Sequence, residues 1–174
     1  MSLLLVVAVA ACHKEEEAVV GVAQNAANAE HKAQVFATER DQQRAALDLI
    51  PLPTKSMYVD VHEPGAWENP FLSVDAGSLT LRVTMADANT SSLGQGTLLR
   101  PEAARRQEVQ LRPADLAQAL IALPSGVWPY GRVIAVAESP LASHKDRPKV
   151  RRNIEAAIKE LSDLGIVVEE WPTR

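Results

Sequence analysis

The stretch DRPKVRRNIEAAIKELSDLGIVVEEW (residues 146–171) carries the strongest helix signal in the chain, followed directly by a strand signal. Apolar residues at three- and four-residue spacing predict the buried stripe of one helix: Val150, Ile154, Ala157, Ile158, Leu161 and Leu164. Gly165 stands where a glycine commonly ends a helix. The run IVVEEW (166–171) then predicts a closing strand.

The sequence before this stretch continues the alternation of strands and helices. RVIAVAE (132–138) is apolar enough for a central strand, and EVQLR (108–112) predicts another. Between them, Pro113 occupies a probable first helical position, and ADLAQALIAL (114–123) predicts a helix. Three leucines of this helix share one side: Leu116, Leu120 and Leu123.

Earlier segments predict shorter strands. SLTLRVTMAD (78–87) alternates apolar and polar residues, which is typical of a strand with one buried face. Residues 72–74 and the alternating residues 57–61 predict two more strands, whereas ANTSSLGQG (88–96) has the composition of a loop. From residue 79 the order is strand, strand, helix, strand, helix, strand. We therefore expect an α/β or α+β domain over residues 51–174, with a small mixed sheet and two helices packed on one face.

The N-terminal run LLLVVAVAAC (3–12) ends in the only cysteine of the chain. A membrane-spanning helix needs about 20 apolar residues, and three glutamates follow at positions 15–17. A short apolar run leading to small residues is typical of a secretory signal peptide. An apolar N-terminus with a chance cysteine is the alternative interpretation.

The residues Val9-Ala10-Ala11-Cys12 resemble the lipobox of bacterial lipoproteins. The resemblance covers residues 1–12 and implies that residues 1–11 are a removable signal peptide. It also implies that diacylglycerol is attached to Cys12 through a thioether. A lipoprotein of this kind lies in the cell envelope, anchored to a membrane and facing the periplasm, and His13, in place of an aspartate, favours the outer membrane.

Residues 12–50 are rich in good helix formers, and Pro51 provides a stop signal. A mostly alanine stripe runs along the segment: Val19, Val22, Ala26, Ala29, Ala33 and Phe36, then Leu47 and Ile50. We expect either a helical stalk or a partly ordered polar tether, and the composition does not choose between the two.

Composition narrows the function classes. The net charge is −4, with ten acidic and five basic residues in 1–70, and twelve and thirteen in 71–174. Nucleic-acid binding is not expected, because such domains are usually strongly basic. The four histidines show no metal-ligand spacing, and no serine lies in an acyl-transfer motif. The sequence thus predicts no catalytic residue, metal site or cofactor.

Two clusters remain as candidate recognition elements. The cations of HKDRPKVRR (144–152) form a possible anion-binding site: Lys145, Arg147, Lys149, Arg151 and Arg152. A solvated rim is the alternative. The loop VWPYG (127–131) presents Trp128 and Tyr130 as a possible recognition loop, or as a lid on the core.

These observations favour a lipid-anchored envelope protein with a small non-catalytic binding module for an envelope protein or polymer. A second hypothesis rests on element order alone, because residues 79–171 resemble the periplasmic module of the ExbD/TolR family. That resemblance implies an accessory of an envelope transport machine. A third hypothesis is an envelope hydrolase that uses dispersed carboxylates.

Overall fold

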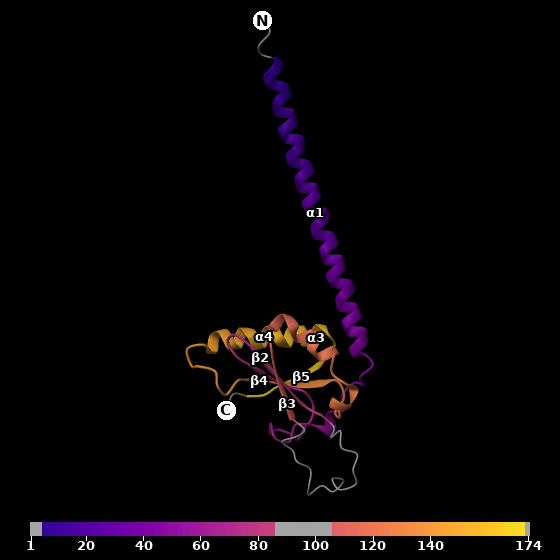
Figure 1. Ribbon diagram of the computed structural model, residues 1–174, viewed down its shortest axis with the longest axis vertical. Coiled ribbons are helices and arrows are strands. Elements are labelled where there is room, and N and C mark those ends of the chain that lie inside the picture. Colours follow the sequence, from indigo (N-terminus) through magenta and orange to yellow (C-terminus); the bar gives the residue numbers. More distant parts are fainter. Residues whose placement is uncertain (1–4, 86–105, 173–174) are drawn as a thin grey trace. The chain divides into compact units, whose positions relative to one another are not determined.

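The computed structural model describes residues 5–85 and 106–172, and gives only the backbone for residues 5–23 and 26. The chain divides into two compact units, Met1–Gln42 and Gln43–Arg174, which are described separately below. Helix α1 spans Leu5–Leu47 (Figure 1). Its residues 5–42 form the described part of the first unit, and its residues 43–47 belong to the second unit. Val35 and Phe36 on α1 are 51% and 68% exposed.

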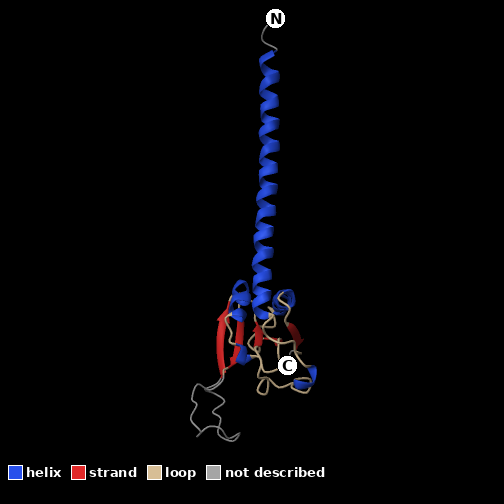
Figure 2. Cartoon of the chain, turned by 90° about the vertical axis from the view of Figure 1, so that its right-hand side faces the viewer, coloured by secondary structure: helices blue, strands red, loops and turns tan. Residues whose placement is uncertain are grey.

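The second unit is built on a mixed five-stranded sheet (Figures 1 and 2). The strands are β1 (Phe71–Val74), β2 (Leu79–Thr84), β3 (Arg106–Leu111), β4 (Val133–Glu138) and β5 (Val167–Glu170), in the spatial order β3-β2-β1-β4-β5. β2 runs antiparallel to β1 and β3, whereas β4 runs parallel to β1 and β5. The predicted α+β class and mixed sheet are confirmed.

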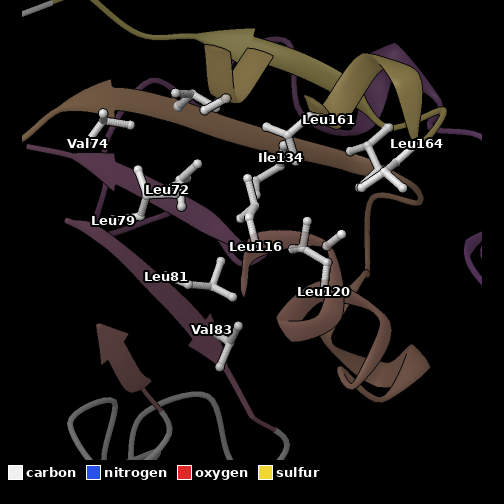
Figure 3. Close-up of a cluster of buried hydrophobic side chains, with 14 of the residues drawn as sticks. Leu72, Val74, Leu79, Leu81, Val83, Leu116, Leu120, Ile134, Leu161 and Leu164 are labelled. Atoms are coloured by element: carbon white, nitrogen blue, oxygen red, sulfur yellow. The ribbon is translucent and has the colours of Figure 1, made fainter. Parts of the chain in front are cut away.

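The helices pack on one face of this sheet. Leu116–Ile121 forms α3, preceded by the 3-10 turn η3 (Pro113–Asp115), and Arg147–Asp163 forms α4. A second 3-10 turn, η4 (Ser125–Val127), leads into β4. Figure 3 shows leucines of both helices and side chains of β1, β2 and β4 meeting in one core. Each large aliphatic side chain buried there contributes about 1.5–3 kcal/mol.

The predicted α4 stripe and its cap are both present. Val150, Ile154, Ala157 and Leu161 are buried within α4. Gly165 has a φ of +76°, and the amides of residues 165 and 166 donate to the carbonyls of Ser162 and Leu161 at 2.9 Å each. This pair of bonds satisfies helix-terminal carbonyls and turns the chain into β5.

The connector, residues 48–70, covers part of the opposite, helix-free face of the sheet. The predicted strand at 57–61 is wrong, because Lys55–Met57 forms the 3-10 turn η1 and turns continue to residue 60. Tyr58 is 5% exposed, whereas its neighbours Met57 and Val59 are 52% and 41% exposed. The connector therefore buries an aromatic ring against the sheet and does not pair as a strand. The predicted loop at 88–96 lies outside the described residues.

Candidate ligand-binding site

The helix-free face of the sheet holds a cavity of about 550 Å³. Its floor follows from the register of three neighbouring strands: Ser73 on β1 lies opposite Thr80 on β2 and Ala137 on β4. All three side chains are small, so this row leaves room above the sheet. The next row carries the larger Phe71 and Arg82, which lie opposite each other at the edge of this floor and line the cavity.

The segment between β4 and α4, together with the first residue of α4, forms another wall, with Ser139, Pro140, Leu141, His144 and Arg147 lining the cavity. This segment leaves the carboxyl end of β4, which is parallel to β1. In sheets with parallel strands, ligands commonly bind in the crevice outside the carboxyl ends. A volume of this size is also within the usual range for small-molecule sites.

Arg82 is the charged group of the cavity floor. Its guanidinium lies 4.4 Å from the centre of the Phe71 ring, and its Nη2 donates to the Pro64 carbonyl at 2.7 Å. Burial lowers the pKa of Arg82, and the nearby Arg106 lowers it further. Arginine keeps its charge over the physiological range, because its ordinary pKa lies far above neutrality. The second cross-strand neighbour of Arg82 is Glu108, which is exposed on β3 and also lines the cavity.

An aromatic cluster borders the cavity and holds the ring of Trp171, which lines it, in place. The members of this cluster are Tyr58, Trp67, Phe71, Tyr130 and Trp171. The ring of Trp171 packs edge-on against Phe71 and Trp67, with centroids 5.4 and 5.5 Å apart. Trp67 also packs edge-on against Tyr58 and Tyr130, and its Nε1 donates to the Pro70 carbonyl at 3.0 Å. Burial raises the pKa of Tyr58, and the adjacent Glu169 raises it further.

Asn69 joins this cluster to the start of β4. Its side chain is 1% exposed and donates to the carbonyls of Gly131 and Val133 at 2.8 and 2.7 Å. Its Oδ1 accepts from the Tyr130 amide at 2.8 Å. The connector is thereby tied to the sheet by three hydrogen bonds of a buried side chain.

All five predicted anion-binding cations are exposed at the entry to α4 and along its first turns. Arg151 pairs with Glu155 and Glu170, and Arg147 lies 3.6 Å from a Glu138 carboxylate oxygen. Within the described parts of the chain, Lys145, Lys149 and Arg152 have no carboxylate in salt-bridge range. Of the five, Arg147 lines the cavity. The other four are neighbours of Arg147 in the sequence.

The predicted recognition loop is divided between two environments. Trp128 is 4% exposed and belongs to the core beneath the helices, whereas Tyr130 is part of the aromatic cluster on the helix-free face. The burial of Trp128 agrees with the alternative interpretation of this loop as a lid on the core. Tyr130 holds the connector in place through its backbone amide and ring.

The backbone of Cys12 lies within α1, and its side chain is outside the described residues. Among the side chains that the structure describes, no group of three or more His, Cys, Asp or Glu residues is placed to hold a metal ion. In the same described portion, no helix combines the length and the apolar character needed to cross a membrane.

Comparisons of the chain with protein-family models, with curated proteins and with solved structures found no match.

The cavity was not predicted from the sequence. Ser73, Thr80 and Ala137 come from three strands, and they form one row only through the register of an antiparallel and a parallel pairing. The alternation of residues within each strand indicates only that each of these three side chains lies on the face opposite the core. Which outward residues become neighbours depends on the register, which the sequence pattern does not specify.

Proposed function

We propose that this chain is a lipid-anchored bacterial cell-envelope protein whose compact unit is a small non-catalytic binding module. The observation that carries the binding part is the cavity of about 550 Å³ on the helix-free face of the sheet. Its lining combines aromatic and aliphatic surface with a few polar groups, which is typical of small-molecule sites.

The anchoring part is supported by the lipobox-like residues Val9-Ala10-Ala11-Cys12 at the end of an apolar run. In this proposal the peptide is cut before Cys12, whose thiol carries the lipid. The helix from Cys12 to Leu47 would rise about 50 Å at 1.5 Å per residue, which is enough for a stalk between membrane and module. The module then acts in the periplasm, with the outer membrane favoured by His13, and its partner is an envelope protein or polymer.

An alternative proposal is an ExbD/TolR-like accessory of an envelope transport machine. The observation that favours it is the order β3, α3, β4, α4, β5, which matches the element order of that family's periplasmic module. Under this alternative, the protein co-purifies with an inner-membrane complex after chemical cross-linking. A chain recovered with the outer membrane and without such a complex favours the lipoprotein proposal.

The hydrolase hypothesis requires two carboxylates that face each other in the cavity. The two glutamates among the described lining residues are Glu108 on β3 and Glu138 on β4. These strands are three places apart in the sheet, or about 14 Å at the usual strand spacing. Paired catalytic carboxylates of glycosidases lie about 5–9.5 Å apart. The backbones that carry Glu108 and Glu138 are farther apart than this, and the placement of the two residues therefore favours binding over this chemistry.

The anchoring proposal is tested by expressing the wild-type chain and a Cys12→Ser variant in bacteria with radiolabelled palmitate. We expect label and membrane association in wild type, and loss of both in Cys12→Ser, because serine provides no thiol for the thioether. Ala33→Ser, at an exposed position of α1, is the matched control and should keep label and membrane association. Globomycin should cause the unprocessed chain to accumulate in wild type. Equal label or equal membrane association in wild type and Cys12→Ser would overturn the proposal.

A further inference from the structure

The chemistry of the cavity wall restricts what it can hold. Phe71 and Trp171 contribute aromatic surface, and Leu141 at the wall is 88% exposed. Apolar and aromatic side chains that line a cavity provide contact surface for an apolar ligand. Pro64, Pro140 and Pro172 extend the same apolar lining. Most of the body of a fitting ligand is therefore hydrocarbon or ring.

The polar groups of the floor form one cluster. Ser73 and Thr80 lie opposite each other on adjacent strands, and Arg82 follows Thr80 on the same side of β2. Nη2 of Arg82 donates to Pro64, but a guanidinium carries five N–H donors, so others remain for a ligand. Two hydroxyl groups and a guanidinium suit a carboxylate or a phosphate.

The charged residues at the cavity and next to it in the sequence also favour a negatively charged ligand. Among the described lining residues, Arg82 and Arg147 balance Glu108 and Glu138. Next to Arg147 in the sequence, the β4–α4 segment and the start of α4 add Lys145, Lys149 and Arg152 against one acidic residue, Asp146. The three cations have no carboxylate in salt-bridge range among the described residues. This excess of positive charge attracts anions toward the cavity.

We infer that the cavity takes a small amphipathic anion, with a carboxylate or phosphate head at Ser73, Thr80 and Arg82 and an apolar body along Phe71, Trp171 and Leu141. The inference rests on the binding part of the proposed function and names the ligand class of that site. The ligand is a lipid-derived or free small molecule in monomeric form, and the membrane surface is a separate possibility that the test below distinguishes.

The test uses the full-length chain with Cys12→Ser, so that binding is measured independently of the anchor. Calorimetry with decanoate, decyl phosphate and uncharged 1-decanol compares three ligands that share one hydrocarbon body. We expect saturable 1:1 binding of at least one anion, with decanol about 10- to 100-fold weaker because it lacks the charge-assisted hydrogen bonds. A stronger response to decanoate or to decyl phosphate identifies the head group. Binding of neither anion, or equal binding of decanol and both anions, overturns the inference.

Two variants locate the site. Arg82→Gln should weaken the binding of both anions about 10- to 100-fold and leave the binding of decanol unchanged. Ala137→Leu should abolish binding of all three compounds by filling the row of small side chains, and it keeps the inference testable if Arg82→Gln fails to fold. Arg112→Gln, which removes an exposed arginine paired with Asp115 away from the cavity, is the control and should bind as the parent does. Unchanged anion binding in folded Ala137→Leu overturns the inference.

A membrane-surface interaction gives a different result. Vesicles of phosphatidylglycerol would then bind the chain, and a Lys145→Gln/Lys149→Gln/Arg152→Gln variant would lose that binding, while monomeric decanoate and decyl phosphate would not bind at all. That outcome contradicts the cavity inference but leaves the anchoring proposal standing. Conversely, anion binding by a chain whose wild type carries no lipid would support this inference and overturn the anchor.

Discussion

At the scale of single residues, Asn69 holds the connector against the sheet. Its side chain is buried and makes three hydrogen bonds to the backbone of residues 130–133. A sequence pattern does not identify such a residue, because an asparagine before a proline also suits an ordinary turn. Its importance depends on partners more than 60 positions away in the chain.

We predict that Asn69→Ala lowers the free energy of unfolding by about 3 kcal/mol, because two carbonyls and one amide lose a buried partner. Urea unfolding followed by tryptophan fluorescence measures the change. Gln107→Ala, at an exposed position of β3, is the control and should stay within about 0.5 kcal/mol of wild type. Equal stabilities of the two variants would show that Asn69 does not tie the connector.

The ion pair of Arg132 and Asp48 gives a pH-dependent prediction. The hydrogen bond from Arg132, which is 7% exposed, lowers the pKa of Asp48, and the charges of Arg132 and Arg44 lower it further. A lowered folded-state pKa stabilises the fold above the unfolded pKa, near 3.9, and this contribution is lost as the pH falls through the folded-state value.

Wild type should therefore be more stable than Asp48→Asn at pH 7, and the difference should shrink as the pH falls from about 5 to 2. Chemical unfolding of both chains at several pH values measures it. A difference that stays constant down to pH 2 would contradict this role of the ion pair.

At the scale of elements, the sequence predicted the strand–helix–strand unit at the C-terminus well. α4 and β5 have strong periodicity and a glycine cap, so local preference and tertiary packing agree there. The segment 57–61 has an alternating pattern too, but Tyr58 packs against Trp67 and Tyr130 and the backbone forms turns. Aromatic packing overrode the strand pattern at that point.

Three glycines in the turns next to β4 and β5 differ in backbone conformation and in the space around them. Gly131 has a φ of +82°, and an added Cβ would lie 2.8–2.9 Å from backbone atoms of residues 51–53. Gly165 has a φ of +76°, but its nearest neighbours are arginine side-chain atoms at 3.5–3.7 Å. Gly126 has no heavy atom within 4 Å of an added Cβ.

The loss of stability caused by alanine at each of the three glycines should therefore follow the backbone φ and the space for an added Cβ. We expect Gly165→Ala to cost about 1–2 kcal/mol of unfolding free energy, and Gly131→Ala to cost more because backbone atoms must also move. Gly126→Ala should stay within about 0.5 kcal/mol of wild type. Thermal unfolding of the three variants gives the ranking, and a Gly126→Ala variant as destabilised as Gly131→Ala would refute it.

At the scale of the whole molecule, the compact unit starts inside α1. Leu47 and Ile50 are 1% and 7% exposed in its core, and Asp48 pairs with Arg132. The sequence stripe placed Leu47 and Ile50 on the helix, but it carried no information about which partner would bury them. Likewise, the class of the fold followed from element order, whereas the cavity required the register of the folded sheet.

A fragment of residues 43–174 should accordingly fold with the stability of the full chain. A fragment of residues 51–174 should lose about 3–6 kcal/mol, because it lacks the buried side chains of Leu47 and Ile50. Urea unfolding of the two fragments and of the full chain makes the comparison. Equal stability of the two fragments would mean that Leu47 and Ile50 add nothing to the core.

Intact-mass spectrometry of the protein purified from bacterial membranes tests most directly the proposal that a lipid on Cys12 holds the chain in the cell envelope. We predict a mature chain that begins at Cys12 and carries a diacylglyceryl group on that residue. A chain that begins at Met1 with an unmodified Cys12 would contradict it.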